Sequence, residues 1–209
     1  MTNDHDHGHD GHGHDHEHEH EHEHDGGDDY AEEIGRIRAG KDAFFRSSPS
    51  SPIPHGARHD FSGLPYFPVD PSLRYEDLGL APYVGGEPSA FQIPTSDGQL
   101  RPAHRAGTFS FEREGAPRRL TAYVLDGGDP DSLFVPFLDA TSAHETYGAG
   151  RYLDLEAEDD GSYSLDFNLA YHPYCVYDES YSCPLTPAEN RLPIRIEAGE
   201  RLPEERTEG

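Results

Sequence analysis

The plainest chemistry in this sequence belongs to ten histidines within the first 24 positions. They are interleaved with Gly, Asp and Glu, and from position 12 to position 24 every second residue is a histidine. Neutral imidazole is a ligand for Zn, Ni, Co and Cu, and the carboxylates between the imidazoles add oxygen ligands. We therefore expect this tail to bind divalent transition-metal ions, through His5, His7, His9, His12, His14, His16, His18, His20, His22 and His24.

The role of this metal binding is open. Buffering or delivery of metal is one interpretation, and a solubilising tail that binds metal incidentally is the other. An expression tag fits less well, because tags are usually unbroken histidine runs. Many equal ligands without fixed geometry do not discriminate among metals, so affinity should follow the Irving–Williams order. Uptake should fall steeply as protons compete for the imidazoles.

A second concentration of chemistry lies in residues 139–152, where Glu145 and Arg151 flank a Gly-Ala-Gly turn. A carboxylate can act as a base, and a guanidinium can grip a carboxylate or phosphate with two hydrogen bonds. We take Glu145, Arg151, Tyr147 and Tyr171 as catalytic candidates; a structural salt bridge is an equal alternative. The predicted ligand-binding residues are Thr141, Ser142, Glu145, Tyr147, Gly148, Gly150, Arg151, Asp166 and Asn168. For Asp166 and Asn168, simple solvent exposure is the favoured interpretation.

The two cysteines, Cys175 and Cys183, form a weaker candidate site together with His172. Their spacing matches no common zinc pattern. A local disulfide or two buried thiols is the favoured interpretation, and a low-probability metal site is the alternative.

The charge balance excludes whole classes of partner. The chain carries 41 acidic and 16 basic residues and a net charge of -25. Nucleic acids and anionic membranes repel such a surface, so we expect neither as a partner. Lys41 is the only lysine. An acidic chain nearly free of lysine is typical of a halophilic protein, because high salt screens self-repulsion. No apolar leader is visible, so we expect a cytoplasmic location.

The predicted organisation is a disordered tail over residues 1–27 followed by a single β-rich domain over 28–209. Residues 28–52 read as an N-terminal helix and linker, with Tyr30, Ile34, Ile37, Phe44 and Phe45 near one helix face. Residues 53–100 are rich in Pro and Gly and are predicted to wrap the domain in an extended form.

A period of two predicts the β core within residues 106–200. The expected strands lie at 106–112, 120–125, 133–138, 153–156, 163–169 and 192–196. The fourth and fifth of these should form a hairpin around the turn at 159–161. The predicted fold class is mainly β, an antiparallel β-barrel or sandwich with one N-terminal α-helix.

Several of these stretches resemble the family called domain of unknown function 1684. Residues 139–152 are similar to its pattern Asp-x-Thr-Ser-x-x-Glu-Thr-Tyr-Gly-x-Gly-Arg-Tyr. Residues 166–175 resemble Asp-Phe-Asn-x-Ala-Tyr-x-Pro-x-Cys, and 183–192 resemble Cys-Pro-Leu-x-Pro followed by Glu-Asn-x-Leu. At position 172 the family pattern looks like Asn, whereas this chain has His172. The resemblance covers about residues 30–200, leaves out the tail and implies no activity.

We therefore expect a small-ligand-binding β domain carrying a metal-binding tail. One alternative is an enzyme of hydrolase or isomerase type that uses Glu145 and Arg151. The other is a protein-interaction module that docks a partner on an aromatic patch.

Overall fold

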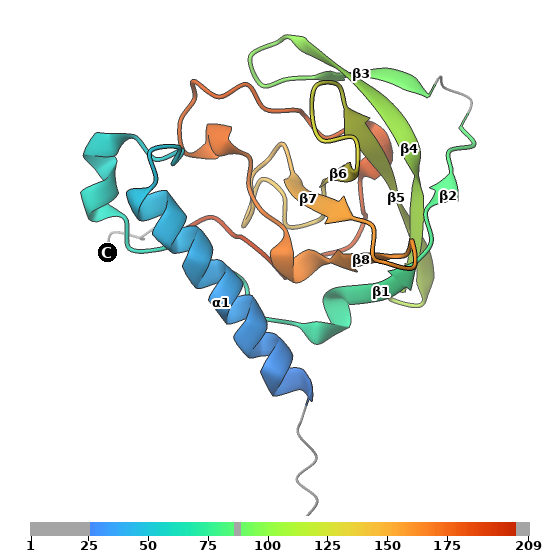
Figure 1. The fold of residues 1–209 in the computed structure, drawn as a ribbon, viewed down its shortest axis with the longest axis horizontal. Helices are drawn as coiled ribbons and strands as arrows, with labels where there is room; N and C mark the ends of the chain where they lie inside the picture. Colours follow the sequence, from blue (N-terminus) through green and yellow to red (C-terminus); the bar gives the residue numbers. More distant parts are fainter. Residues whose placement is uncertain (1–25, 86–88, 204–209) are drawn as a thin grey trace, which may run out of the picture.

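The computed structural model describes residues 26–85 and 89–203, so nearly all of the predicted tail lies outside the described residues. Helix α1 spans Gly26–Ser47, starting two residues earlier than predicted. Asp28 and Asp29 lie in its first turn and Arg46 in its last, which suits the helix dipole. Figure 1 shows α1 lying along one side of the β structure.

The buried stripe of α1 differs in part from the expected one. Tyr30, Ile34 and Phe45 are buried as predicted, but Ile37 and Phe44 are 47% and 37% exposed. The stripe instead continues through the half-buried Arg38 and Lys41, at spacings of three or four residues from Ile34 and Phe45. A pattern of apolar residues does not predict this stripe, because two of its members, Arg38 and Lys41, are charged.

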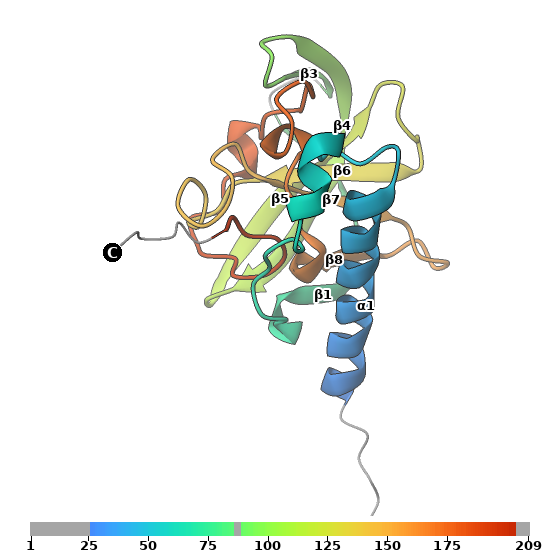
Figure 2. The same ribbon diagram turned by 90° about the vertical axis from the view of Figure 1, so that its left-hand side faces the viewer.

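Six strands form one antiparallel sheet in the order β2–β4–β5–β6–β7, with β3 also paired to β4. A separate two-stranded ladder joins β1 to β8. The strands are β1 (Arg74–Leu78), β2 (Ala81–Pro82), β3 (Ala90–Pro94), β4 (Leu100–Arg113), β5 (Ala116–Leu125), β6 (Ser132–Phe137), β7 (Arg151–Glu156) and β8 (Tyr163–Asp166). Short 3-10 helices lie at His55–Asp60, Pro71–Leu73, Phe167–Leu169, Tyr174–Val176 and Ala188–Asn190. The mainly β, antiparallel class is confirmed, and the described strands do not close into a barrel (Figures 1 and 2).

The β4–β5 hairpin is the longest feature of the sheet, and its turn lies where the sequence predicts it. Glu114 and Gly115 both have positive φ, 56° and 65°, which matches a type I′ turn. The strand alternation is equally clear: Phe109 and Phe111 are buried, while Ser110 is exposed.

One predicted strand pairing and the predicted form of one segment are wrong. The expected hairpin between 153–156 and 163–169 does not form, because β7 pairs with β6 and β8 pairs with β1. Residues 53–100 are also not merely an extended wrap, since they contain β1, β2 and β3. A long-range partner replaces the local one in both cases, which periodicity alone does not reveal.

The predicted last strand, 192–196, is an extended segment rather than a strand. Its burial alternates as expected: Leu192, Ile194 and Ile196 are buried and the residues between them are exposed. These three side chains complete the main core together with aromatic and aliphatic residues of β4 to β8. The period of two is therefore correct for burial, while the hydrogen bonds of this segment go elsewhere.

None of the helices in the described residues is long and apolar enough to cross a membrane.

Candidate functional site

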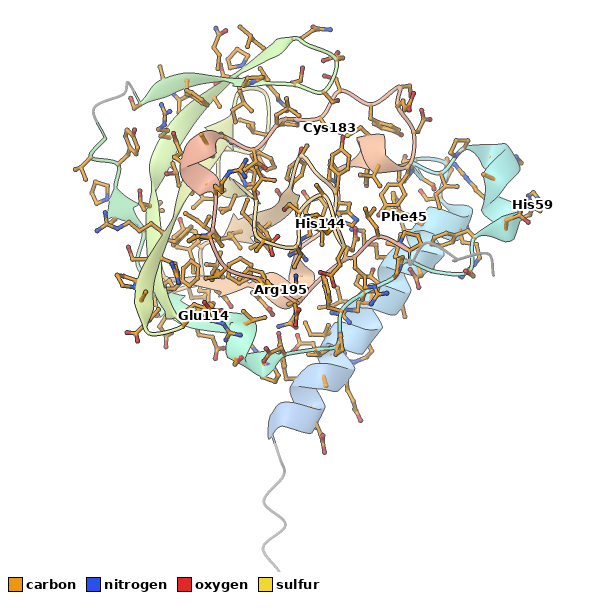
Figure 3. The ribbon with its side chains drawn as sticks, turned by 180° about the vertical axis from the view of Figure 1, so that it is seen from behind. Phe45, His59, Glu114, His144, Cys183 and Arg195 are labelled. Atoms are coloured by element: carbon orange, nitrogen blue, oxygen red, sulfur yellow. The ribbon has the colours of Figure 1, made fainter. Side chains whose placement is uncertain are left out.

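The structure does not bring the predicted pair of Glu145 and Arg151 together. Arg151 begins β7 and is 1% exposed, whereas the side chain of Glu145 is 42% exposed and pairs with Arg195. Figure 3 shows the face that carries Arg195, with the neighbouring loop marked by His144. The expected Glu–Arg site is therefore not formed: Glu145 belongs to a surface ion pair, and Arg151 is buried separately from it.

Arg151 has a structural role, because it binds the extended segment that follows residue 192. Its guanidinium donates hydrogen bonds to the carbonyls of Ala198, Ile196 and Glu200, at 2.8 Å for Ile196 and 3.2 Å for Glu200. It also lies 3.5 Å from an Asp139 carboxylate oxygen. Burial lowers the pKa of Arg151 to about 10, opposed by Asp139 and Glu200, so it stays charged at neutral pH.

Asp139 complements Arg151 from the other side of the same segment. Its carboxylate accepts the Ile196 amide at 2.7 Å and the Thr141 hydroxyl at 2.8 Å. Together these two side chains satisfy the backbone groups of Ile196 and the carbonyls of Ala198 and Glu200, beyond the point where the segment bonds the backbone of Leu138 and Ala140. We call Arg151, Asp139 and residues 196–200 the Arg151 network.

Part of the predicted ligand loop is also directed inward, although Ser142 and Tyr147 are half-buried and Gly148 is exposed. The Thr141 and Thr146 hydroxyls lie 3.0 Å apart, and both residues are fully buried. Gly150 has φ of +107°, and a Cβ there would meet the Phe137 carbonyl oxygen at 2.5 Å. Gly150 is therefore required by close approach of the protein's own backbone, and the expected approach to a ligand is not needed to explain it.

Asp166 and Asn168 are buried, so the favoured interpretation of solvent exposure is wrong. They are 5% and 1% exposed. The Tyr30 hydroxyl donates to Asp166 at 2.6 Å, and the Asn168 amide donates to the Tyr30 oxygen and the Asp70 carbonyl. These side chains attach the start of α1 and the chain at residue 70 to the β core.

His172 is buried and neutral. Its Nε2 accepts the Tyr147 amide at 3.2 Å, while burial, aided by Arg151 and Lys41, lowers its pKa to about 3. Because Nε2 accepts a hydrogen bond, the one proton of the neutral ring lies on Nδ1, 3.7 Å from a Glu200 oxygen that already accepts from other donors. No group of three metal-ligating side chains occurs in the described residues. The alternative of a metal site at His172, Cys175 and Cys183 is therefore not assembled. Of the favoured interpretations, the structure has two free thiols rather than a disulfide, with Cys183 buried and Cys175 half-buried.

The structure assembles a different site, of which the sequence predicted only the candidate residues Tyr171 and Cys183. A cleft of about 490 Å³ lies between α1, the start of β4, β7 and the loop 171–184. Lys41, Arg101 and Asp154 are its charged residues. Its aromatic lining consists of Phe134, Tyr152, Tyr171, Tyr174 and Tyr181. We call this the Lys41 cleft. Figure 3 marks Cys183, another lining residue, between the sheet and the end of α1 at Phe45.

Lys41 is held in position by a buried carboxylate. Its Nζ lies 2.5 Å from Oε1 of Glu200, which is 1% exposed. The other Glu200 oxygen accepts the His172 amide at 2.7 Å and the Tyr177 hydroxyl at 3.0 Å. The ammonium also lies 4.6 Å from the centre of the Tyr171 ring. Three donors on one ammonium leave Lys41 able to bind a further acceptor.

Arg101 differs from the other arginines. This residue is half-buried, and its guanidinium forms no ion pair, hydrogen bond or ring contact with a described residue. Every other buried or half-buried arginine in 26–85 and 89–203 meets an acid, a carbonyl or a ring. These are Arg38, Arg58, Arg74, Arg105, Arg113, Arg118, Arg151 and Arg201. A half-buried guanidinium without a partner, in a chain rich in acids, suits a site that receives an anion.

The aromatic residues give the cleft flat apolar walls. Tyr152 and Tyr171 meet edge to face at 5.7 Å between ring centres, and Tyr174 and Tyr181 do so at 5.3 Å. The Tyr171 hydroxyl donates to Asp154, which occupies part of that carboxylate. A smaller groove of about 280 Å³ beside α1 is lined by Glu33, Glu156 and Glu158, among others, and does not suit an anion.

Two sequence signals pointed toward the cleft. Lys41 is the only lysine, and four tyrosines fall within residues 171–181. Neither signal carries a motif spacing, and nothing in the sequence joins them to Arg101.

Comparison with known proteins gives a family and a fold relative. A model of a protein family of unknown function, DUF1684, matches residues 59–201. An uncharacterised protein from Haloarcula marismortui, solved in solution by NMR, is 38% identical with a TM-score of 0.63. The match covers 86% of this chain and 98% of that one. No curated protein matches the chain.

Proposed function

Because the chain belongs to the DUF1684 family, which brings no activity with it, we propose from its own geometry that it binds a small ligand in the Lys41 cleft. The ligand class that fits is a flat, largely apolar molecule with one carboxylate. The observation that carries this proposal is the unpartnered Arg101 at an aromatic cleft that also holds Lys41.

Size and chemistry support this ligand class. A volume of about 490 Å³ lies within the range of small-molecule sites. Tyrosine faces pack against planar rings, and the two cations can each donate to a carboxylate. The overall charge of -25 opposes anions over long distances, but molar salt screens that field within a few ångströms. Local contacts with Lys41 and Arg101 then decide the affinity.

Calorimetry on the full chain with 2-naphthoate and its uncharged amide tests the proposal. The carboxylate should bind saturably with one site, and the amide should bind at least about tenfold more weakly, as expected for loss of a charge-assisted hydrogen bond. Arg101→Gln should weaken 2-naphthoate binding by a similar factor. Arg119→Gln removes an exposed arginine on β5 and is the matched control. Equal affinity for the acid and the amide, or for wild type and Arg101→Gln, would contradict the proposal.

We propose metal capture by the histidine-rich tail as a second function. It is supported by the ten histidines of residues 1–24, which lie outside the described residues. Zn or Ni titration of the full chain should show several ions per chain, with uptake falling as the pH drops through the titration of imidazole. A chain lacking residues 1–25 should lose most of this uptake and keep its melting temperature. Unchanged uptake, or a stoichiometry of one, would refute this assignment.

We further propose that the protein works in the cytoplasm of a salt-loving cell. The support is the acidic composition with a single lysine, together with the relative from a haloarchaeon. Its melting temperature should rise from low to molar KCl, because salt screens the repulsion among carboxylates. Calorimetric scans measure this directly, and equal midpoints in the two buffers would sink the proposal.

A further inference from the structure

The only two cysteines of the chain lie against each other. The Cys175 amide donates to the Cys183 sulfur at 3.3 Å, and both thiols are free. The Cys183 sulfur therefore contacts the backbone nitrogen bonded to the Cys175 Cα, and the two cysteine side chains also interact with each other. We propose that this pair is a reversible oxidation site that reacts with low-molecular-weight disulfides and closes to an internal disulfide.

The two thiols differ in access. Cys183 is buried, and its place is fixed because its amide donates to the Ser96 hydroxyl while its carbonyl accepts the Ser96 amide. Cys175 is half-buried and lines a surface hollow of about 710 Å³ beside Tyr147 and Asp97. Its thiol points to the Tyr147 hydroxyl at 3.9 Å. A reagent entering from solvent therefore meets Cys175 first.

The reaction has two balanced steps. The Cys175 thiol loses its proton, and its sulfur attacks one sulfur of the small disulfide; a mixed disulfide forms and one small thiolate leaves and takes up a proton. The Cys183 thiol then loses its proton, and its sulfur attacks the Cys175 sulfur and releases the second small thiol. In total the protein pair gives up two electrons and two protons, and the small disulfide becomes two thiols.

The environment of Cys183 makes the second step the slower one. Burial raises the pKa of the Cys183 thiol to about 11; the Cys175 side chain adds to this rise and the Cys175 amide opposes it. Little Cys183 thiolate therefore exists at neutral pH, and thiolate is the attacking species. The mixed disulfide on Cys175 should consequently live long enough to be detected.

Oxidation at this site would act on the Lys41 cleft. The disulfide would close a loop over residues 175–183, and that loop carries Tyr181, Ser182 and Cys183 of the cleft wall. The oxidation itself does not depend on any ligand, so its test and the ligand test fail independently.

The test is intact-mass spectrometry of the reduced full chain after incubation with oxidised glutathione. Wild type should pass through one glutathione adduct and end two hydrogens lighter, without an adduct. Cys183→Ser should stop at one adduct, because no second thiol can displace it. Cys175→Ser should gain its adduct at least about tenfold more slowly, because its remaining thiol is buried and protonated.

Circular dichroism shows whether each variant is folded. If a serine variant fails to fold, proteolytic mapping of the oxidised wild type for a Cys175–Cys183 linked peptide decides the matter. Wild type that keeps its adducts, or that forms only disulfide-linked dimers, would overturn the proposal. So would a folded Cys175→Ser that reacts as fast as Cys183→Ser.

Discussion

The Arg151 network and the Lys41 cleft each contain an arginine and aromatic side chains, but they differ in what the guanidinium contacts. Arg151 lies 5.1 Å from the centre of the Phe137 ring and donates to three carbonyls beside the Asp139 carboxylate. Arg101 has no partner in the described residues. The network is rich in sequence motif, and both terminal nitrogens of its guanidinium donate hydrogen bonds, although the buried Nε of Arg151 has no partner. The cleft lacks a motif and leaves a whole guanidinium unpaired. A dense polar motif can thus mark the interior of a fold, and an unsatisfied group is the better sign of a ligand site.

Replacing Arg151 should have the largest effect on stability. Arg151→Met keeps an apolar stem but leaves Asp139 and three carbonyls without their donor. We expect the free energy of unfolding to fall by about 3 to 5 kcal/mol, the usual cost of breaking a buried pair. Urea unfolding at neutral pH measures it. The matched control is Arg195→Met, whose side chain is 46% exposed in its pair with Glu145 and should matter by less than about 1 kcal/mol. Equal losses in the two variants would remove the distinction drawn here.

His172 should give a smaller effect that depends on pH. Its pKa is 6.5 when exposed and about 3 in the fold, so the unfolded chain takes up a proton that the folded chain refuses. The stability it supports is present above pH 6.5 and is lost as the pH falls through that value, by about 2 kcal/mol between pH 7 and pH 5. His172→Asn should flatten this part of the stability curve in urea titrations taken across that range. A slope identical to that of wild type would show that His172 titrates alike in both states.

Arg101 should have the smallest effect on stability. Arg101→Gln breaks no interaction with a described residue, so we expect the free energy of unfolding to stay within about 0.5 kcal/mol of wild type. The same variant should show the large loss in 2-naphthoate binding described above. A marked loss of stability in urea would mean that Arg101 supports the fold after all, and would weaken the contrast with Arg151.

Local patterns in the sequence predict the elements well. The helix is found within two residues at its start, and β4 follows the period of two, whereas β6 is buried on both faces and shows no alternation. The pattern fails where partners are distant. Residues 163–166 pair with β1 rather than β7. In residues 192–196, Leu192 and Ile194 bond the backbone of Leu138 and Ala140 just after β6, while Ile196 bonds the side chains of Arg151 and Asp139.

The candidate site was harder to predict for the same reason. Glu145 and Arg151 lie six residues apart, but one projects from a loop and the other points into the core at the start of β7. Lys41 and Arg101 come from a helix and a strand with no shared motif, and only the folded chain brings them to one cleft. The spacing of Lys41 and Arg101 along the sequence therefore does not predict that they line the same cleft.

The way α1 is attached has a consequence for the synthesis of the chain on the ribosome. Tyr30 binds Asp166, which is 136 residues further along, and Lys41 binds Glu200 near the end of the described chain. Arg151 likewise waits for the carbonyls of residues 196 to 200. The helix is therefore synthesised well before the residues that hold it, and the bonds of Tyr30 and Lys41 cannot form until residues 166 and 200 have been made. Phe45 can pack early on Ile53 and Leu64, but until those bonds form the rest of the packed face is open to chaperones and to neighbouring chains.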